Sequence, residues 1–211
     1  MIKAIETIYN GYRFRSRLEA RWAVFFDALG VEYEYEPEGY EYGGWEGSKP
    51  YRWLPDFRLT SEDNLLVEVK GCDEELEKDW DKLSVAVDFH STPASNGLLI
   101  LGNIPNPDDV RWGSIPVFSY LEWDEGITCD FAAFTDNDKC HVIRGQRALE
   151  HYVYSYEGND LKVDYTGGFS EMPSCVTTKT RIPRLLSRDF DKLKAAYAKA
   201  RQARFEYGET P

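Results

Sequence analysis

The sequence predicts a mixed α/β fold of the α+β type, with one mixed sheet flanked by helices. Three observations predict it. The first hundred residues change between helical and strand periodicity in the order helix, strand, strand, strand, helix, strand. Beyond Pro105 short alternating stretches are separated by turn residues, and a last helix follows. We therefore expect a core at 1–105, a β-rich addition at 106–178, and a basic C-terminal helix at 179–211 that packs on the core.

The composition fits one large domain, because the chain has 211 residues of which 42% are hydrophobic. The net charge of −12 argues against binding nucleic acid through bulk charge. The basic residues are nonetheless clustered. Residues 179–204 hold nine Lys or Arg against two Asp, and a second cluster near the N-terminus contains Arg13, Arg15, Arg17 and Arg21.

The cysteines and the N-terminus indicate a cellular location. Cys72, Cys129, Cys140 and Cys175 lie far apart and form no CxxC pair. The start of the chain lacks an apolar signal core, and no run approaches the ~20 apolar residues of a membrane span. We expect a cytoplasmic protein (in the host cytoplasm if it is encoded by a phage) with reduced thiols and no membrane partner.

The first two elements follow from side-chain periodicity. A helix is expected to begin at Ser16, with apolar residues at helical spacing from Leu18 to Leu29, and Gly30 fits the position just past its end. The next stretch, "VEYEYEP", alternates strictly, with Val31 at the start of its apolar face, and predicts a half-exposed strand.

The elements that follow complete the predicted core. "GYEYGGWEGSKP" is a glycine-rich excursion, "RWLPDFRL" and "NLLVEVKG" predict two strands, and residues 73–90 predict a helix. "GLLILGNIP" has the composition of a buried strand. In the β-rich addition, the stretches "PVFSYLEW", "DFAAFT", "CHVIRG", "HYVYSYEG" and "LKVDYTG" predict strands, and the last helix is expected at 189–207 with Phe190, Leu193 and Tyr197 as apolar anchors.

Charged residues interrupt the two strands in the middle of the core. Glu68 and Lys70 are two residues apart and therefore lie on the same face of their strand. If the two strands form an antiparallel hairpin with a three-residue loop at Ser61–Asp63, Asp56 lies opposite Glu68 and shares that face. The sequence thus predicts two carboxylates and one amine at one place on the sheet.

Two neighbouring carboxylates repel each other by about 4 kcal/mol at ~4 Å in a partly buried site. A cation relieves this repulsion: Lys70 supplies one charge, and a divalent ion supplies two. Oxygen ligands suit Mg²⁺, which keeps several waters and accepts a substrate phosphate as a further ligand. Phosphodiester cleavage needs a polarised phosphoryl oxygen, a deprotonated water in line with the bond, and positive charge to offset the developing anion. A site of this kind supplies all three.

The chain resembles the PD-(D/E)XK nuclease superfamily. Pro55-Asp56 and Glu68-Val69-Lys70 match its motif, and the helix "SRLEARWAVFFDALGVEYEYEP" resembles the opening of a branch found in transposon end-cleaving endonucleases and actinobacterial phage proteins. The resemblance covers Tyr12 to Pro105 and the terminal "ARQARFEYG". It implies a restriction-endonuclease-like core and a Mg²⁺-dependent DNA nuclease, with phage-type DNA processing, recombination or defence as its setting.

The resemblance also implies roles for individual residues. Asp56, Glu68 and the carbonyl of Val69 would bind Mg²⁺, for which Mn²⁺ would substitute. Lys70 would orient or help deprotonate the attacking water. Glu19 on the first helix would complete the metal shell, so the catalytic set is Glu19, Asp56, Glu68 and Lys70. The DNA partner would be held by Arg13, Arg15, Arg17 and Arg21.

Alternatives exist for each part of this site. Asp56, Glu68 and Lys70 also fit an exposed strand face that carries a charge pair. Ser16 and Glu19 also form the pattern of a helix capping box. The four arginines also fit a solvated face. Cys129, Cys140 and His141, with Cys175 as a fourth ligand, form a weak zinc candidate. For the whole protein, the alternative is a non-catalytic module that binds nucleic acid or protein, with its acidic surface as a DNA mimic.

Overall fold

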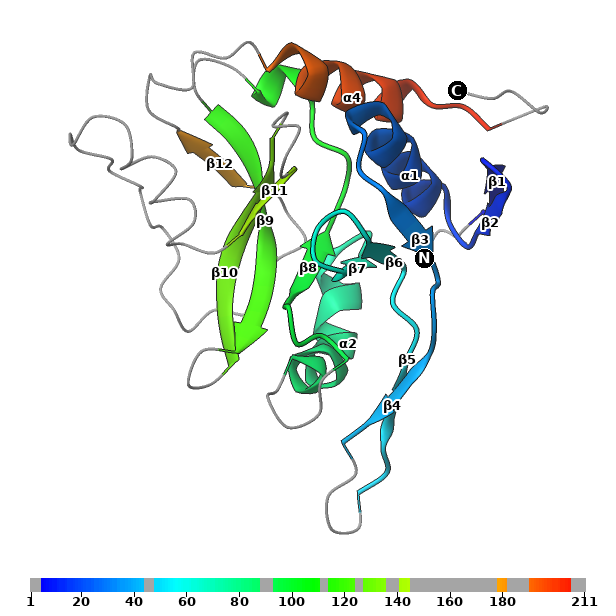
Figure 1. The fold of residues 1–211 in the computed structure, drawn as a ribbon, viewed down its shortest axis with the longest axis vertical. Helices are drawn as coiled ribbons and strands as arrows, with labels where there is room; N and C mark the ends of the chain where they lie inside the picture. Colours follow the sequence, from blue (N-terminus) through cyan, green and yellow to red (C-terminus); the bar gives the residue numbers. More distant parts are fainter. Residues whose placement is uncertain are drawn as a thin grey trace.

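The structure, a computed structural model, describes residues 5–43, 48–87, 93–110, 114–123, 127–135, 141–144, 178–181 and 190–205. It is mixed α/β, as the sequence predicts: helices cover a mixed sheet (Figure 1). Three α-helices lie within the described residues, α1 (Arg17–Leu29), α2 (Asp73–Ala86) and α4 (Asp191–Gln202), along with a short 3-10 helix η1 (Pro107–Asp109). None of the described helices is long and apolar enough to span a bilayer.

The main sheet has eight strands, and seven of them follow the order β11-β10-β9-β8-β7-β6-β3, while β12 pairs with β9. The strands are β3 (Tyr33–Tyr35), β6 (Phe57–Leu59), β7 (Leu65–Val69), β8 (Leu98–Leu101), β9 (Ser114–Trp123), β10 (Ile127–Phe134), β11 (Val142–Arg144) and β12 (Thr178–Arg181). Within the described residues only β7 and β8 pair in parallel, and α2 lies between them in the chain. Because β9 pairs with β8, the β-rich addition continues the sheet of the core.

Helix α1 forms as its sequence predicts. Ser16 is its N-cap, and the Ser16 Oγ accepts the backbone N–H of Glu19 at 3.2 Å. Gly30 ends the helix with φ 88°, a left-handed conformation that glycine adopts without steric cost. The buried side of the helix includes Trp22, whose indole N–H donates to the carbonyl of Gly102 at 2.8 Å.

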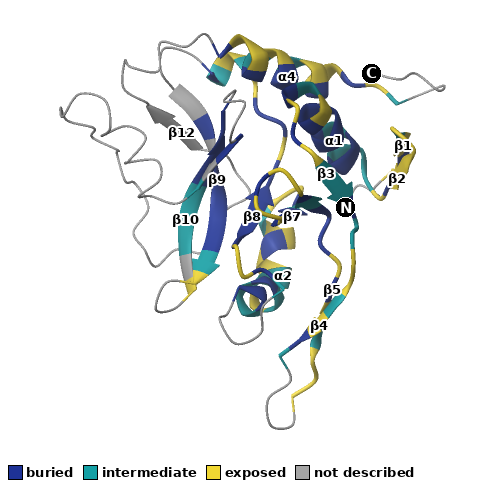
Figure 2. Cartoon of the chain, in the orientation of Figure 1, coloured by how far each residue is buried: buried dark blue, intermediate teal, exposed yellow. Residues whose placement is uncertain are grey.

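Side chains alternate along the strands and form a hydrophobic core on each face of the sheet. Phe57, Leu65 and Val67 belong to the larger core, which includes the buried residues of α1 and α4. In this core Tyr197 of α4 stacks on Phe25 of α1, with ring centroids 4.5 Å apart. The expected anchors Phe190, Leu193 and Tyr197 are all buried. Figure 2 shows the buried inner surface of α1 and the mixed burial of α4.

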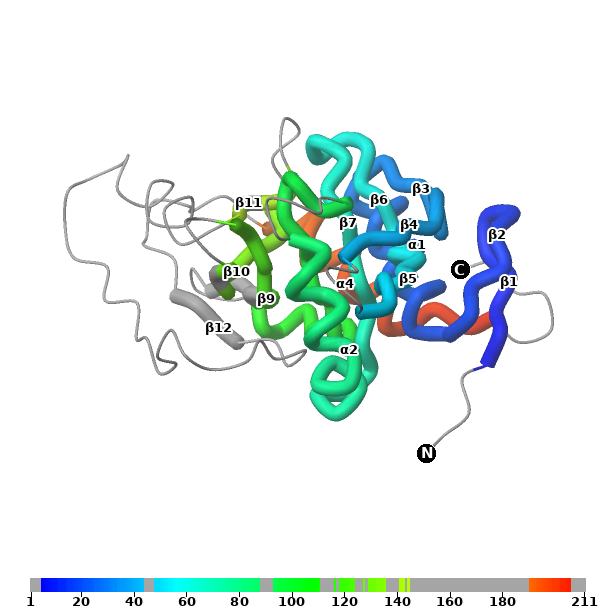
Figure 3. The backbone as a smooth tube through the Cα atoms, turned by 90° about the horizontal axis from the view of Figure 1, so that it is seen from below, coloured from blue at the N-terminus to red at the C-terminus, as the bar shows by residue number. Residues whose placement is uncertain are grey.

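Leu66 of β7 and the apolar side of α2 form the second core, on the opposite face. Here α2 presents Leu76 and Leu83, both fully buried. In the view from below, the β1–β2 hairpin and β10 lie toward opposite ends of the described chain (Figure 3).

Two hairpins stand apart from the main sheet. The first joins β1 (Thr7–Tyr9) and β2 (Tyr12–Phe14), and the second joins β4 (Tyr40–Tyr42) and β5 (Tyr51–Trp53). The prediction of one strand from Arg52 to Leu59 is wrong, because the chain leaves the β4–β5 hairpin at Trp53 and enters β6 only at Phe57. Pro55 lies in this break, and proline has no N–H to donate to a continuous ladder. The glycine-rich excursion likewise contains a strand, β4.

The predicted elements at the ends of the described ranges agree with the structure where it describes them. Helix α2 starts at Asp73 and ends at Ala86, and residues 88–90, the end of the predicted helix, lie outside the described residues. Strands β9, β10 and β11 fall on three of the predicted stretches. The stretches "HYVYSYEG" and "LKVDYTG" lie outside the described residues, as do Cys140, His151 and Cys175.

Candidate active site

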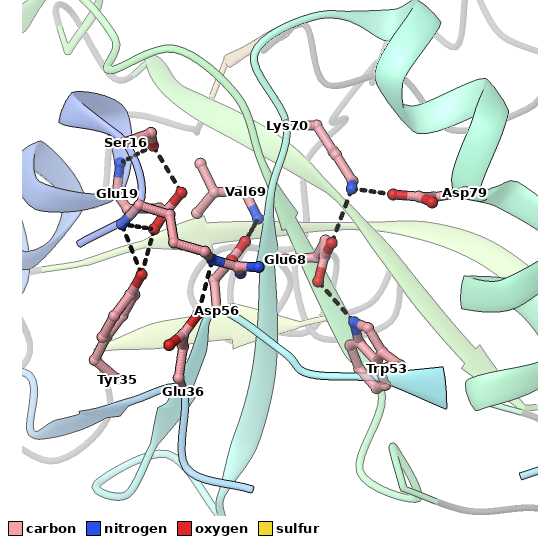
Figure 4. Close-up of polar contacts among 11 residues, drawn as sticks. Ser16, Glu19, Tyr35, Glu36, Trp53, Asp56, Glu68, Val69, Lys70 and Asp79 are labelled. Carbon is pink, nitrogen blue, oxygen red and sulfur yellow. Dashed lines mark hydrogen bonds and ion pairs between the residues drawn. The ribbon is translucent and has the colours of Figure 1, made fainter. Parts of the chain in front are cut away.

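Asp56 and Glu68 lie opposite each other at the open end of the β6–β7 hairpin. The register pairs Leu59 with Leu65 and Phe57 with Val67, so the next opposed positions are 56 and 68. The expected register is therefore confirmed. Both carboxylates are buried, as is Lys70 two residues further on (Figure 4). Buried charged residues are rare unless they are paired, so each needs an identified partner.

The carboxylate of Asp56 has a partner on each oxygen. Its Oδ2 accepts the backbone N–H of Val69 at 2.7 Å, and its Oδ1 contacts the Arg15 guanidinium at 2.5 Å. Burial, followed by the charges of Glu68 and Glu19, raises the pKa of Asp56 well above its usual value, although Val69 and Arg15 act in the opposite direction. Asp56 thus lies in a buried place where two further carboxylates, Glu68 and Glu19, act against its ionisation.

Glu68 and Lys70 form a second group of contacts on the α2 side. Lys70 Nζ lies 2.9 Å from Glu68 Oε1 and also contacts the Asp79 carboxylate of α2. Glu68 Oε2 accepts the indole N–H of Trp53 at 2.7 Å. Burial alone would lower the pKa of Lys70, but the charge of Glu68 and the contacts with Asp79 outweigh it and raise this pKa above its usual value. Lys70 is therefore an ammonium at neutral pH.

Glu19 adopts the arrangement of a helix cap. Its Oε1 accepts the Ser16 hydroxyl at 2.7 Å, and its Oε2 accepts the Tyr35 hydroxyl at 2.6 Å and the backbone N–H of Arg15 at 3.1 Å. The capping-box alternative is met in part: the Ser16 Oγ accepts the Glu19 N–H, but the Glu19 carboxylate accepts the Arg15 N–H where a capping box would use the Ser16 N–H. The same carboxylate is buried beside Asp56 and contributes to its raised pKa. The structure thus brings Glu19 next to Asp56 through the loop that carries Arg15.

The four N-terminal arginines lie in different places in the structure and have different contacts. Arg15 reaches the site, where its Nε also lies 2.7 Å from Glu36 Oε1. Arg13, on β2, is exposed and pairs with Glu6. Arg17 and Arg21 are half-buried on α1, and the Nε of Arg21 is buried without a hydrogen-bond partner. The sequence did not reveal which of them contacts a site carboxylate, as Arg15 does.

The described part of the zinc candidate has other contacts. The His141 Nδ1 lies 3.1 Å from Glu62 Oε1, and Cys129 packs at the second core, where burial raises the pKa of its thiol to about 11. Across the described ranges, no three His, Cys, Asp or Glu side chains are grouped as a ready-made metal site. Asp56 and Glu68 are two carboxylates opposed across one hairpin, and each is engaged by a cation of the chain.

Three polar neighbours of the site were not anticipated: Trp53, Asp79 and Glu36. Trp53 ends β5, which the sequence did not separate from β6. Asp79 is half-buried on α2 and also pairs with Lys82 at 3.1 Å, an i,i+3 spacing that is visible in the sequence. Trp53, Asp79 and Glu36 contact Glu68, Lys70 and Arg15, respectively. These contacts form through tertiary packing, which the periodicity of the sequence does not reveal.

Comparison with known proteins identifies no relative of this chain. No protein-family model, no curated protein and no solved structure matches the chain.

Proposed function

We propose that the protein is a Mg²⁺-dependent nuclease that hydrolyses DNA phosphodiester bonds, with a restriction-endonuclease-like core. The observation that carries the proposal is the pair of buried carboxylates, Asp56 and Glu68, opposed across the β6–β7 hairpin with Lys70 beside them. Buried carboxylates with perturbed pKa values are costly for stability and cluster at functional sites. Their position also matches the sequence motif of the nuclease superfamily.

The donors fit the proposed ion by their chemistry. Carboxylate oxygens are the hard ligands that Mg²⁺ prefers. Burial and the charges of Glu68 and Glu19 raise the pKa of Asp56, and a divalent cation beside it would favour its ionised form. Asp56 and Glu68 would hold the ion, with the carbonyl of Val69 and with Glu19 as further proposed ligands. When bound, Mg²⁺ or Mn²⁺ supplies an activated water and polarises the phosphate.

The chain's own residues then have distinct roles in the proposed reaction. Lys70 stays protonated and supplies positive charge for the phosphate and an N–H donor for the attacking water. Asp79 and Glu68 hold its ammonium between them. Arg15 offers a second positive charge at the exposed side of the site. The proposed DNA contact is local, since the net charge of the chain is −12.

A cleavage assay tests the proposal. Labelled duplex and single-stranded DNA are incubated with Mg²⁺, Mn²⁺ or EDTA and with wild type, Asp56→Asn or Glu68→Gln. We expect metal-dependent cleavage by wild type and loss of cleavage in both variants. Glu41→Gln is the matched control, because Glu41 is an exposed carboxylate paired with Arg52 on the β4–β5 hairpin. Absence of cleavage by wild type on every DNA form would contradict the proposal.

One observation favours a second candidate. The site carboxylates already have partners within the chain, Arg15 for Asp56 and Lys70 for Glu68. A non-catalytic module needs no ion and would keep such a network for stability alone. This candidate would bind nucleic acid or protein, with its acidic surface as a DNA mimic. Binding of a partner that persists in EDTA, with no cleavage under any condition, would support it.

A further inference from the structure

The contacts of the Arg15 guanidinium point to a role that the sequence did not predict. Its guanidinium bridges two carboxylates, with Nη2 2.5 Å from Asp56 Oδ1 and Nε 2.7 Å from Glu36 Oε1. The Arg15 side chain is 54% exposed, whereas the Asp56 side chain is 5% exposed. A half-exposed cation therefore covers a buried carboxylate that is a proposed ion ligand.

Glu36 is held beside Asp56 by an unusual backbone conformation. Its φ is 46°, in the left-handed region, and the next residue is Pro37. Residues before proline normally adopt extended conformations, so this geometry is strained and persists only where the surroundings impose it. The backbone N–H of Glu36 donates to the carbonyl of Asp56 at 2.9 Å. Glu36 therefore forms a fixed second acceptor for Arg15.

The main chain of Arg15 is also fixed. Its backbone N–H donates to the Tyr35 hydroxyl at 2.9 Å and to Glu19 Oε2 at 3.1 Å. These bonds belong to the N-terminal cap of α1 and do not involve the guanidinium. The Arg15 side chain can therefore leave Asp56 by rotating about its own bonds while the main chain stays in place.

We propose that Arg15 is an exchangeable cation of the site. Without metal it neutralises Asp56 and Glu36. A divalent ion displaces it from Asp56, and the released guanidinium, retained near the site by its fixed main chain, binds a DNA phosphate. This inference rests on the proposed function, because it assigns to Arg15 a competition with the proposed ion. The ion and the guanidinium are like charges that compete for Asp56 Oδ1, so Arg15 weakens metal binding and metal makes Arg15 available to DNA.

Calorimetric titration with Mn²⁺, in the absence of DNA, tests the competition. We expect Arg15→Gln to bind Mn²⁺ about tenfold more tightly than wild type, because the competing cation is gone. Arg15→Lys should lie between the two, since an ammonium cannot bridge both carboxylates with a planar fork. Arg13→Gln is the control: it removes the same charge from an exposed pair with Glu6 and should bind Mn²⁺ like wild type.

A second titration measures binding of a short duplex DNA in EDTA and in Ca²⁺. Arg15→Gln should lose affinity for DNA more strongly in Ca²⁺ than in EDTA, because only the metal-bound protein has a free Arg15. If Arg15→Gln and Arg15→Lys bind Mn²⁺ no more tightly than wild type, the proposed exchange is wrong. Such a result would not contradict the metal site itself. Failure of every variant and of wild type to bind Mn²⁺ would overturn both the exchange and the proposed nuclease function.

Discussion

The indole N–H of Trp53 donates to Glu68 Oε2 at 2.7 Å, and both residues are buried. Lys70 contacts the other oxygen of the same carboxylate. Glu68 therefore has one neutral and one charged donor, which together fix its orientation on β7. Trp53 belongs to the β4–β5 hairpin, which projects from the body of the molecule (Figure 1), so that hairpin helps to position the site.

Trp53→Phe should destabilise the metal-free protein by about 1.5–3 kcal/mol, the usual contribution of a hydrogen bond to a charged group. Phenylalanine keeps an aromatic ring but removes the donor. The measurement is urea unfolding in EDTA. In a Glu68→Ala background the same substitution should cost clearly less, because the bond is already lost. Equal losses in both backgrounds would mean that the ring, and not the N–H, stabilises the fold.

Lys70→Ala should reduce the rate of DNA cleavage by on the order of 10²-fold or more, because it removes the ammonium that stabilises charge on the phosphate. DNA and Mn²⁺ binding should stay near wild type. Glu68 and Asp79 raise the pKa of Lys70, so the ammonium is present throughout the neutral range. The pH–rate profile of wild type should therefore show no limb due to Lys70 between pH 6 and 9. Lys70→Arg should recover part of the rate, and full activity of Lys70→Ala would contradict the role.

Asp56→Asn should raise the melting temperature of the metal-free protein at neutral pH. Because burial and the charges of Glu68 and Glu19 raise the pKa of Asp56, the folded state holds this proton more tightly than the unfolded chain does. The stability of wild type therefore falls as pH rises from the unfolded pKa of about 3.9 through the folded pKa. The advantage of Asn should be greatest above the folded pKa and vanish near pH 4.

Thermal unfolding in EDTA from pH 4 to 9 measures this difference. Asp81→Asn changes an exposed carboxylate of α2 and should give a small difference from wild type with little dependence on pH. A lower melting temperature for Asp56→Asn at every pH would show that the ion pair of Asp56 with Arg15 stabilises the protein more than the burial of Asp56 and its repulsion by Glu68 and Glu19 destabilise it.

Glu62→Ala should destabilise the protein by on the order of 3 kcal/mol, since buried N–H groups lose their acceptor. The buried Glu62 carboxylate accepts the backbone N–H groups of His141 and Val142 at 2.9 and 3.2 Å, which ties the β6–β7 turn to β11. Urea unfolding and hydrogen exchange at these two amides measure the effect. Asp63→Asn, which breaks only the exposed pair with Arg144, should cost about 1 kcal/mol or less.

Local patterns predicted much of the core. The N-cap at Ser16, the end of α1 at Gly30, and the opposition of Asp56 and Glu68 follow from capping and from strand parity, which depend on neighbouring residues. The β4–β5 hairpin was missed because glycines conceal the alternation around Tyr40. The roles of Asp79 and Glu36 could not be predicted, since their partners are brought together only when α2 and β3 pack on the sheet.

The place of β8 in the sheet has a consequence for dividing the protein. Its four residues, Leu98–Leu101, are almost fully buried and pair with β7 on one side and β9 on the other. A fragment that ends at Pro105 would leave this strand with an open apolar edge, and such edges recruit other chains and aggregate. The strands that follow Pro105 thus cover the edge of the sheet that carries the proposed site. A fragment without these strands is expected to aggregate.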